Sequence, residues 1–327
     1  MEKRLINFQA GWAGVFAKLN MYVVACKEAK RKNFQPVPYW PSVWHDEDID
    51  VWDIFLKRLN HQVEDKCQPI DEINIVKLFA KREKDKSVNP APQYAGVLRE
   101  PFDRKACYEI IHEYIHLQTW LTDKIDSLYE QSFQSRRILG VHLRGPGKDD
   151  VGHGGVDRLN YLLGVGSPPF PKYFEIIDAC LEDYDRIFLG TDAGMVQKKM
   201  RERYGNKVFT VASDQYELGE AHARNTSQAG ISFNKLGMEA IVDAYLLSRC
   251  DFLIHGNSHL SNFVMCLNPD LPTRNVYEGL YDRAASPQLR MKSMWNKEII
   301  PILKHGPIGK TRGKLGLLRR QLMRKKV

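Results

Sequence analysis

The sequence predicts an α/β protein built on a doubly wound parallel sheet. Between residues 136 and 278, short runs rich in Ile, Leu, Val and Phe alternate with segments of the helical period. This alternation indicates parallel strands whose connecting helices cover both faces of the sheet. Polar side chains follow several of these runs, at the carboxyl ends where such sheets bind ligands.

The expected elements follow from the spacing of the apolar residues. In the second half, strands are expected at 136–143, 185–192, 207–213, 251–256 and 273–278. Helices are expected between them, at 169–184, 193–205, 235–250 and 259–269. In the first half, apolar residues from Trp12 to Cys26 predict a helix whose beginning carries the small-residue cluster Gly11–Gly14, and residues 34–40 predict a strand. Residues 105–134 have the pattern of one long helix.

Composition and charge limit the classes of function. The chain has 327 residues, enough for two domains, with 43% hydrophobic and 27% charged residues. These values are typical of a soluble globular protein, and no apolar run is long enough to span a bilayer. The net charge of +8 is concentrated in residues 304–327, which contain nine Lys and Arg and no acid. The nearly neutral remainder argues against a nucleic-acid-binding domain.

The basic tail and the cysteines indicate the cellular compartment in which the protein is found. Residues 304–327 alternate basic residues with Leu and Met, which is typical of an amphipathic segment on an anionic membrane surface. The start of the chain lacks the apolar core of a secretory signal, and six cysteines without C-x-x-C spacing indicate reduced thiols. We therefore expect a cytoplasmic protein, peripheral on the inner membrane face. A disordered solubilising tail is the simpler alternative.

The polar side chains at the strand ends predict a binding site. The first strand ends in His142-x-Arg144 and runs into a loop with Gly145 and Gly147, whose N–H groups suit an anion. The Arg144 guanidinium offers the fork of donors that fits a diphosphate. The other candidates come from later strand ends and one helix: Thr191, Asp192, Asp243, Asn257 and Ser258. Neither G-x-G-x-x-G nor G-x-x-x-x-G-K-[ST] occurs, so a dinucleotide dehydrogenase and a P-loop NTPase are disfavoured.

Several blocks resemble one family. "GVHLRGPGKDD" (140–150) resembles the H-x-R loop of the fucosyltransferase superfamily with the GT-B fold. Further blocks match its alpha-1,6-fucosyltransferase branch, which includes the bacterial nodulation fucosyltransferases. These blocks are "RIFLGTDAGMV" (186–196), "YELGEAH" (216–222) and "GMEAIVDAYLLSRCDFLIHGNSHLSNF" (237–263). "AGWAGVFAKLNMYVVACKEA" (10–29) and "PVPYW" (36–40) resemble the first helix and second strand of its N-terminal domain.

The resemblance implies a fold and a reaction. The fold would be two Rossmann-like domains that face a cleft. Residues 1–135 would form the acceptor side, 136–295 the nucleotide-sugar domain and 296–327 the basic tail. The reaction would be transfer of L-fucose from GDP-fucose to a glycan hydroxyl with inversion, without an essential metal or cofactor. A lipid-linked or surface polysaccharide is a reasonable acceptor for a chain with this tail.

The resemblance also implies roles for the candidates. Arg144 would contact the diphosphate and His142 would brace the loop or the nucleotide. Asp192 and Asp243 would hold guanine, ribose or the Arg144 side chain. Hydroxyls and loop groups would complete the site: Thr191, His222, Asn257, Ser258 and Ser261.

The chemistry also requires a base. Displacement of a diphosphate by an alcohol needs positive potential at the leaving oxygen and a group that takes the proton of the nucleophile. Asp149, Asp150 and His153 follow Arg144 closely, and we rank them as the base in that order. The family's acidic residue in this loop does not align cleanly, since Lys148 occupies one plausible position.

Three alternatives stay open at this point. "HEYIH" is an H-E-x-x-H pattern, in which His112, Glu113 and His116 would serve a zinc hydrolase if one helical face carried both histidines. The enzyme could use another nucleotide sugar as donor. A protein that binds nucleotide sugar or glycan without catalysis would keep the same scaffold. A further motif, Asp48-x-Asp50, is interpreted as a helix N-terminus rather than a metal site.

Overall fold

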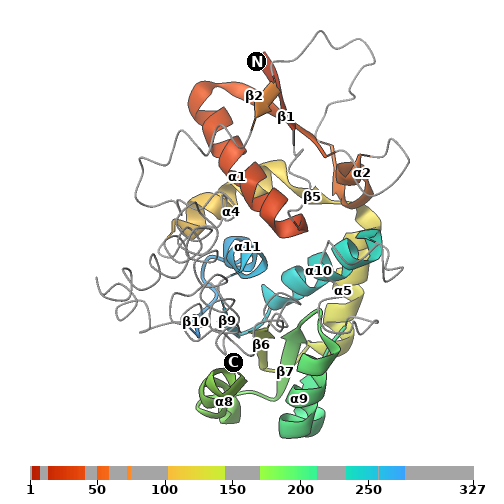
Figure 1. Ribbon diagram of the computed structural model, residues 1–327, viewed down its shortest axis with the longest axis vertical. Coiled ribbons are helices and arrows are strands. Elements are labelled where there is room, and N and C mark those ends of the chain that lie inside the picture. The colour runs from red at the N-terminus through yellow and green to blue at the C-terminus, as the bar shows by residue number, and fades with distance from the viewer. Residues whose placement is uncertain are drawn as a thin grey trace, which may run out of the picture.

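The computed structural model describes eight segments of the chain. They span residues 2–7, 14–40, 50–58, 72–74, 102–143, 170–211, 233–256 and 258–276. Within them, a three-stranded parallel sheet lies at one end of the long axis and a five-stranded parallel sheet lies in the other half, with α1, α4, α10 and α11 between the sheets and α8 and α9 beyond the second one (Figure 1). The prediction of a parallel α/β architecture is confirmed.

The first sheet is formed by the start of the chain. β1 (Glu2–Asn7) lies between β2 (Phe34–Tyr39) and β4 (Glu72–Asn74), and both neighbours run parallel to it. The connection from β1 to β2 is α1 (Val15–Lys32), which is buried along most of its length. α1 ends at Asn33, whose positive φ of 55° makes the left-handed turn into β2. The strand expected at 34–40 is thus confirmed, whereas β1 and β4 were not expected.

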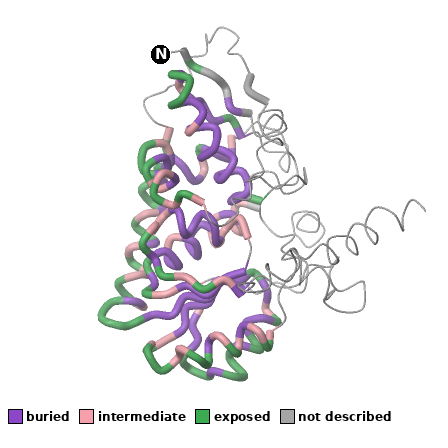
Figure 2. Tube along the Cα trace, turned by 90° about the vertical axis from the view of Figure 1, so that its left-hand side faces the viewer, coloured by how far each residue is buried: buried purple, intermediate pink, exposed green. Residues whose placement is uncertain are grey.

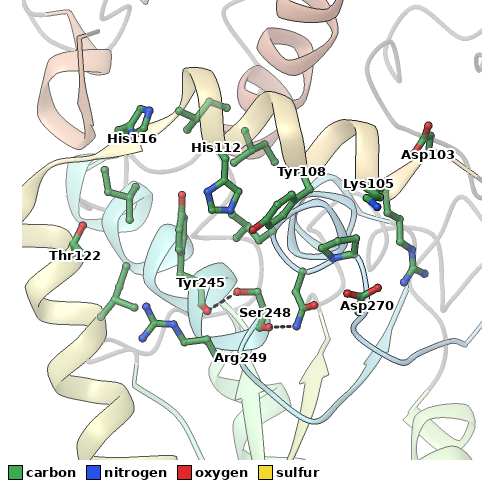
Figure 3. Close-up of a pocket in the computed structure, with 18 of the residues that line it drawn as sticks. Asp103, Lys105, Tyr108, His112, His116, Thr122, Tyr245, Ser248, Arg249 and Asp270 are labelled. Atoms are coloured by element: carbon green, nitrogen blue, oxygen red, sulfur yellow. Dashed lines mark hydrogen bonds between the residues drawn. The ribbon is translucent and has the colours of Figure 1, made fainter.

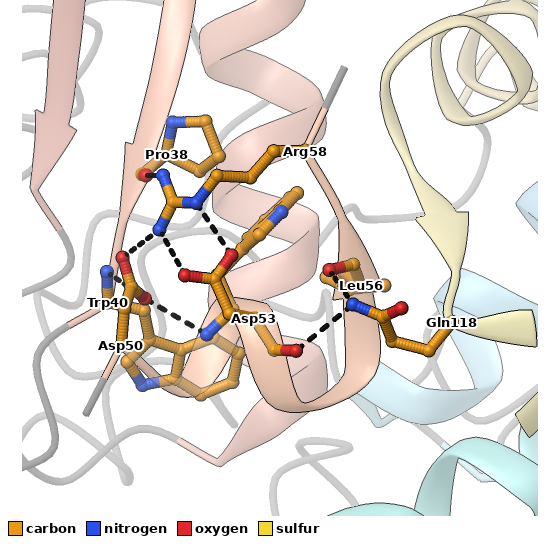
Figure 4. A network of polar contacts seen from close by, with 8 residues as sticks. Pro38, Trp40, Asp50, Asp53, Leu56, Arg58 and Gln118 are labelled. Carbon is orange, nitrogen blue, oxygen red and sulfur yellow. Dashed lines mark hydrogen bonds and ion pairs between the residues drawn. The ribbon is translucent and has the colours of Figure 1, made fainter. Parts of the chain in front are cut away.

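A half-buried arginine, Arg58, ties the end of this sheet to the next segment. α2 (Val51–Phe55) begins at Asp50, whose carboxylate accepts from the N–H groups of Trp40 and Trp52. The Arg58 guanidinium pairs with Asp50 and Asp53 and donates to the Pro38 carbonyl (Figure 4). The interpretation of Asp50 as a helix N-terminus is confirmed. Asp48 lies outside the described residues.

The helix expected at 105–134 is wrong as a single element. α4 (Arg104–Tyr114) ends, β5 (His116–Leu117) follows, and α5 (Thr119–Ser132) begins. The break arises because β5 pairs with β3 (Leu56–Lys57). The Gln118 side chain fixes the junction, since its amide nitrogen donates to the carbonyls of Asp53 (3.0 Å) and Leu56 (2.9 Å).

The second sheet has the strand order β10-β9-β6-β7-β8, all parallel. In chain order its strands are β6 (Ile138–His142), β7 (Arg186–Gly190), β8 (Val208–Phe209), β9 (Phe252–His255) and β10 (Thr273–Asn275). The helices between them are α8 (Phe170–Asp178), α9 (Gly194–Tyr204), α10 (Phe233–Leu247) and α11 (His259–Leu267), with short 3₁₀ turns at Leu181–Asp183 and Gly205–Lys207. This order, read as 5-4-1-2-3, is that of a Rossmann-like sheet. Each strand expected in this half is present, with shorter bounds.

One hydrophobic core joins the two halves. Its buried side chains come from α1 and β2 as well as from α10, α11 and the sheet. Phe16 of α1 packs on Phe263 of α11, with ring centroids 5.2 Å apart. A second core lies beneath α8 and α9 on the other face of the second sheet. Figure 2 shows the buried trace running through the middle of the described part.

Two further findings concern the helices and the cysteines of the described residues. No helix within the described ranges is long and apolar enough to cross a membrane. Five of the six cysteines are described, and all five carry free thiols: Cys26, Cys107, Cys180, Cys250 and Cys266. The basic tail at 304–327 lies outside the described residues.

Gly140 is predicted to be essential for the packing of β6. A Cβ at this position would lie 2.9 Å from the Cys250 sulfur and 3.2 Å from the Phe252 carbonyl oxygen, which the sheet holds in place. We expect Gly140→Ala to lower the free energy of unfolding by about 1–3 kcal/mol in a denaturant titration. Gly14→Ala is the control, because no described atom lies within 4 Å of a Cβ there. Equal stability of the two variants would contradict this account.

Candidate functional site

The site lies where the strand order of the second sheet reverses. The chain proceeds from β6 outward through β7 and β8, and then returns to the other side of β6 with β9. Ligands of doubly wound sheets bind beyond the carboxyl ends of the strands at this point. His142, the last residue of β6, lies level with Gly190 of β7 and with His255 of β9.

A network of two serines and one histidine forms the centre of the site. The His142 ring is buried, and its Nδ1 lies 2.7 Å from Ser261 Oγ and 3.3 Å from Ser258 Oγ. The two hydroxyls are 3.0 Å apart. Ser258 also caps α11, because its Oγ accepts from the Ser261 N–H at 3.0 Å. The network therefore fixes the first turn of α11 directly against the end of β6.

The first turn of α11 suits an anion. The N–H groups of a first helical turn lack partners within the helix, and the helix dipole adds positive potential at that end. Ser258 and Ser261 supply hydroxyls at the same place, with Ser261 fully buried. The geometry thus brings together His142, Ser258 and Ser261, three of the residues predicted for the nucleotide-sugar site.

A group of carboxylates lies beside this network, at the end of β7. Asp243 of α10 is only 6% exposed, and its Oδ1 has no hydrogen-bond partner among the described residues. Burial raises the pKa of the Asp243 carboxyl, and the negative charges of Glu239 and Asp192 raise it further. Thr191 is buried nearby, and its hydroxyl accepts from the Ala193 N–H at 3.3 Å. Asp243 therefore needs a donor or a cation from a ligand, because an isolated buried carboxylate is costly.

Two residues that hold the network were not found from the sequence. Tyr173 of α8 donates from its hydroxyl to the His142 carbonyl at 3.2 Å. Asn20 of α1 is fully buried and donates from its amide nitrogen to the carbonyl of His259, the first residue of α11, at 2.9 Å. The available indication for Asn20 was its position between Leu19 and Met21, in the apolar stretch of α1.

The remaining candidates cannot be placed. Eight predicted residues lie outside the described residues: Arg144, Gly145, Gly147, Asp149, Asp150, His153, His222 and Asn257. The roles assigned to them stay predictions.

The geometry of the H-E-x-x-H pattern contradicts its interpretation as a zinc-protease helix. His112 is on α4, but this helix ends at Tyr114 and His116 belongs to β5, so the two histidines do not share a helical face. Glu113 is engaged elsewhere, since its carboxylate accepts from the Lys30 ammonium at 2.5 Å. Among the described residues, no cluster of three or more His, Cys, Asp or Glu could hold a metal ion.

Comparison with known proteins decides the family. The model of the family described as nodulation protein Z (NodZ) matches residues 74–270, which is more than half of the chain. The chain belongs to the NodZ family. The nodulation protein Z of Bradyrhizobium diazoefficiens is 24% identical over 235 residues, which make up 71% of this chain. The match spans only 58% of the length of that relative.

Solved structures of NodZ proteins share the fold. A NodZ alpha-1,6-fucosyltransferase soaked with GDP-fucose superposes with a TM-score of 0.51 at 17% identity, over 82% of this chain and 94% of that one. The selenomethionine form of the fucosyltransferase NodZ from Bradyrhizobium gives a TM-score of 0.52 at 17% identity, with the same coverage. The likeness confirms the predicted GT-B fold.

We predict that Asp243→Asn changes how stability depends on pH. A carboxyl whose pKa is raised by folding favours the folded state below its unfolded pKa, and this contribution is lost as the pH rises through the folded pKa. Asparagine does not ionise, so the Asp243→Asn variant does not lose stability in this way. The difference in melting temperature between the ligand-free variant and the wild type should therefore shift in favour of the variant as the pH rises from about 5 to 8.

The control for this experiment has the opposite sign. The Arg203 guanidinium lowers the pKa of Asp178 through a hydrogen bond, so the contribution of Asp178 is present at neutral pH and is lost on acidification. The amount by which Asp178→Asn lowers the melting temperature, relative to the wild type, should therefore become smaller at low pH. A constant difference between Asp243→Asn and the wild type at every pH would contradict the assignment of a raised pKa.

Proposed function

We propose that the protein is a glycosyltransferase that moves L-fucose from GDP-fucose to a hydroxyl of a glycan. The observation that carries this proposal is the contact of His142 with Ser258 and Ser261, which presents the start of α11 at the switch point of the second sheet. Membership of the NodZ family supports the proposal. The shared fold with a NodZ fucosyltransferase soaked with GDP-fucose is consistent with it.

In this proposal the diphosphate binds at the start of α11. The Ser258 and Ser261 hydroxyls and the positive end of the α11 dipole face the phosphate oxygens, and His142 holds the hydroxyls in place. Arg144, two residues beyond His142, adds the charge that the leaving GDP requires. Donors fixed in advance of the reaction stabilise developing charge without reorganisation, and this is a large part of catalysis in such sites.

The carboxylates at the end of β7 would recognise the nucleoside or orient Arg144. Asp192 follows β7, the strand next to β6, and the Asp243 carboxylate lies beside Gly190 at the end of β7. Both acceptors are therefore one strand away from His142. Guanine presents N–H donors, ribose presents hydroxyls, and the guanidinium of Arg144 would relieve the buried charge of Asp243. Each of these partners would satisfy the carboxyl oxygen that has no partner among the described residues.

The second half of the proposal concerns the acceptor. Transfer with inversion needs a base on the sugar face opposite the diphosphate, and Asp149, then Asp150 and His153, are the candidates. Residues 1–135 would provide the acceptor side of the cleft, and residues 136–295 the donor side. The basic tail at 304–327 would hold the enzyme at the cytoplasmic face of an anionic membrane, beside a lipid-linked or surface glycan.

Nucleotide preference tests the donor. We expect GDP to raise the melting temperature of the protein more than UDP, CDP or ADP at equal concentration, because only a ligand of the folded state shifts the unfolding equilibrium. Stabilisation by UDP without stabilisation by GDP would overturn the GDP-fucose proposal. Release of GDP from GDP-fucose then separates an enzyme from a protein that only binds the nucleotide sugar.

Two serine variants serve as a matched pair in the same experiment. Ser261→Ala removes a hydroxyl from the network and should weaken GDP binding by about tenfold, the effect of one hydrogen bond to a charged group. Ser248→Ala is the control, because this buried serine donates to the Tyr245 carbonyl at 2.8 Å, at the far end of α10. Equal weakening of GDP binding in both variants would show that the site is misplaced.

A further inference from the structure

A large cavity opens at the opposite end of α11 from the nucleotide site. Its volume is about 1250 Å³, and its walls come from β3, α4, β5 and α5 on one side and from the ends of α10 and α11 on the other. Asn268 and Asp270, which follow α11, line the cavity, whereas Ser258 and Ser261 at the start of α11 belong to the nucleotide site. A helix of nine residues is about 13 Å long, so the two sites are separate.

Aromatic rings face one another across the cavity. Tyr108 and His112 project from α4 with ring centroids 4.1 Å apart, and Tyr245 of α10 lies on the other wall (Figure 3). Both histidines of the H-E-x-x-H pattern, His112 and His116, line this space. Burial raises the pKa of the Tyr245 phenol, so this group stays a neutral donor and acceptor.

The three arginines of the lining are engaged within the protein. Arg58 pairs with Asp50 and Asp53. Arg104 donates to the Leu271 carbonyl at 3.2 Å and to the Thr273 hydroxyl at 2.9 Å. Arg249 pairs with Asp126 at 2.6 Å and lies over the Tyr129 ring. The acceptors of Arg104 are neutral, but Arg58 has two carboxylate partners, so the three guanidinium groups together face three carboxylates and this set carries no net charge.

The remaining charges are balanced. Lys57 and Lys105 line the cavity, and neither has an ion pair with a described residue. Two carboxylates, Asp103 and Asp270, line the same space. Two ammonium groups against two carboxylates give no net attraction for a polyanion. Together with the hydroxyls and imidazoles they offer many donors and acceptors to a neutral ligand.

We infer that this cavity binds a neutral oligosaccharide. Sugar rings have apolar faces that pack on aromatic side chains and hydroxyl rims that need donors and acceptors, and the cavity supplies both. Its volume exceeds the roughly 300–1,000 Å³ of sites for a single small molecule, which leaves room for several sugar units. The inference rests on the proposed function in one respect: the occupant is a segment of the acceptor glycan remote from the hydroxyl that receives fucose.

The test measures glycan binding to the full chain without nucleotide. Titration calorimetry would compare neutral hexasaccharides, such as maltohexaose and cellohexaose, with their monosaccharides, with a sulfated hexasaccharide and with inorganic sulfate. We expect at least one neutral hexasaccharide to bind more tightly than its monosaccharide. Tyr108→Ala should weaken this binding by about tenfold, because it removes one stacking surface. Thr122→Trp should weaken it as well, because the indole would occupy the cavity.

The matched control is Trp120→Ala on α5, the helix that also carries Thr122. Trp120 is 47% exposed but does not line the cavity, so its removal should leave binding unchanged. Binding of sulfated glycan or sulfate alone, binding of no hexasaccharide, or equal loss in all three variants would overturn the inference. Stabilisation by GDP is recorded in parallel. Glycan binding without a response to GDP would contradict the proposed transferase and leave the glycan site standing.

Discussion

The arrangement of the molecule depends on the fixed position of α11. Its first residue accepts a hydrogen bond from Asn20 of α1, and its cap, Ser258, contacts His142 at the end of β6. Along its length it is buried against helices of both halves. The position of one nine-residue helix therefore sets the geometry of the proposed nucleotide site at one end and of the large cavity at the other.

The two ends of α11 differ in what they offer. At the start, the serine hydroxyls and the helix dipole favour an anion, while the buried Asp243 nearby requires a donor or a cation. A nucleotide held by its phosphates and its base would satisfy both. At the far end, carboxylates of the protein balance the charges of the three arginines and the other charges cancel, so the cavity favours a neutral polar ligand. A donor that is charged and an acceptor that is neutral would thus bind at separate ends of one helix.

Sequence patterns predicted the strands and helices between residues 136 and 278 well. Buried parallel strands are continuous apolar runs, and the polar residues at their ends are easy to recognise. The same logic placed His142 and Ser258 at one crevice, and the family resemblance added Ser261; the three side chains do lie in contact. The break after Tyr114 was missed because β5 is fixed by pairing with Leu56 and Lys57, which are distant in sequence. Asn20 was missed for a similar reason, since its partner is a main-chain carbonyl more than two hundred positions away. The cavity is lined by several elements that are distant in sequence, so no single stretch of the sequence predicted it.

Hydrogen–deuterium exchange with and without GDP tests the central claim most directly. The account predicts that GDP slows amide exchange in the first turn of α11, over His259–Asn262, and at the end of β6, while α4 and α5 stay unchanged. These amides face the proposed phosphate site or belong to the network that holds it. Protection confined to α4 and α5, or no protection at the start of α11 under saturating GDP, would contradict the placement of the nucleotide at this end of the helix.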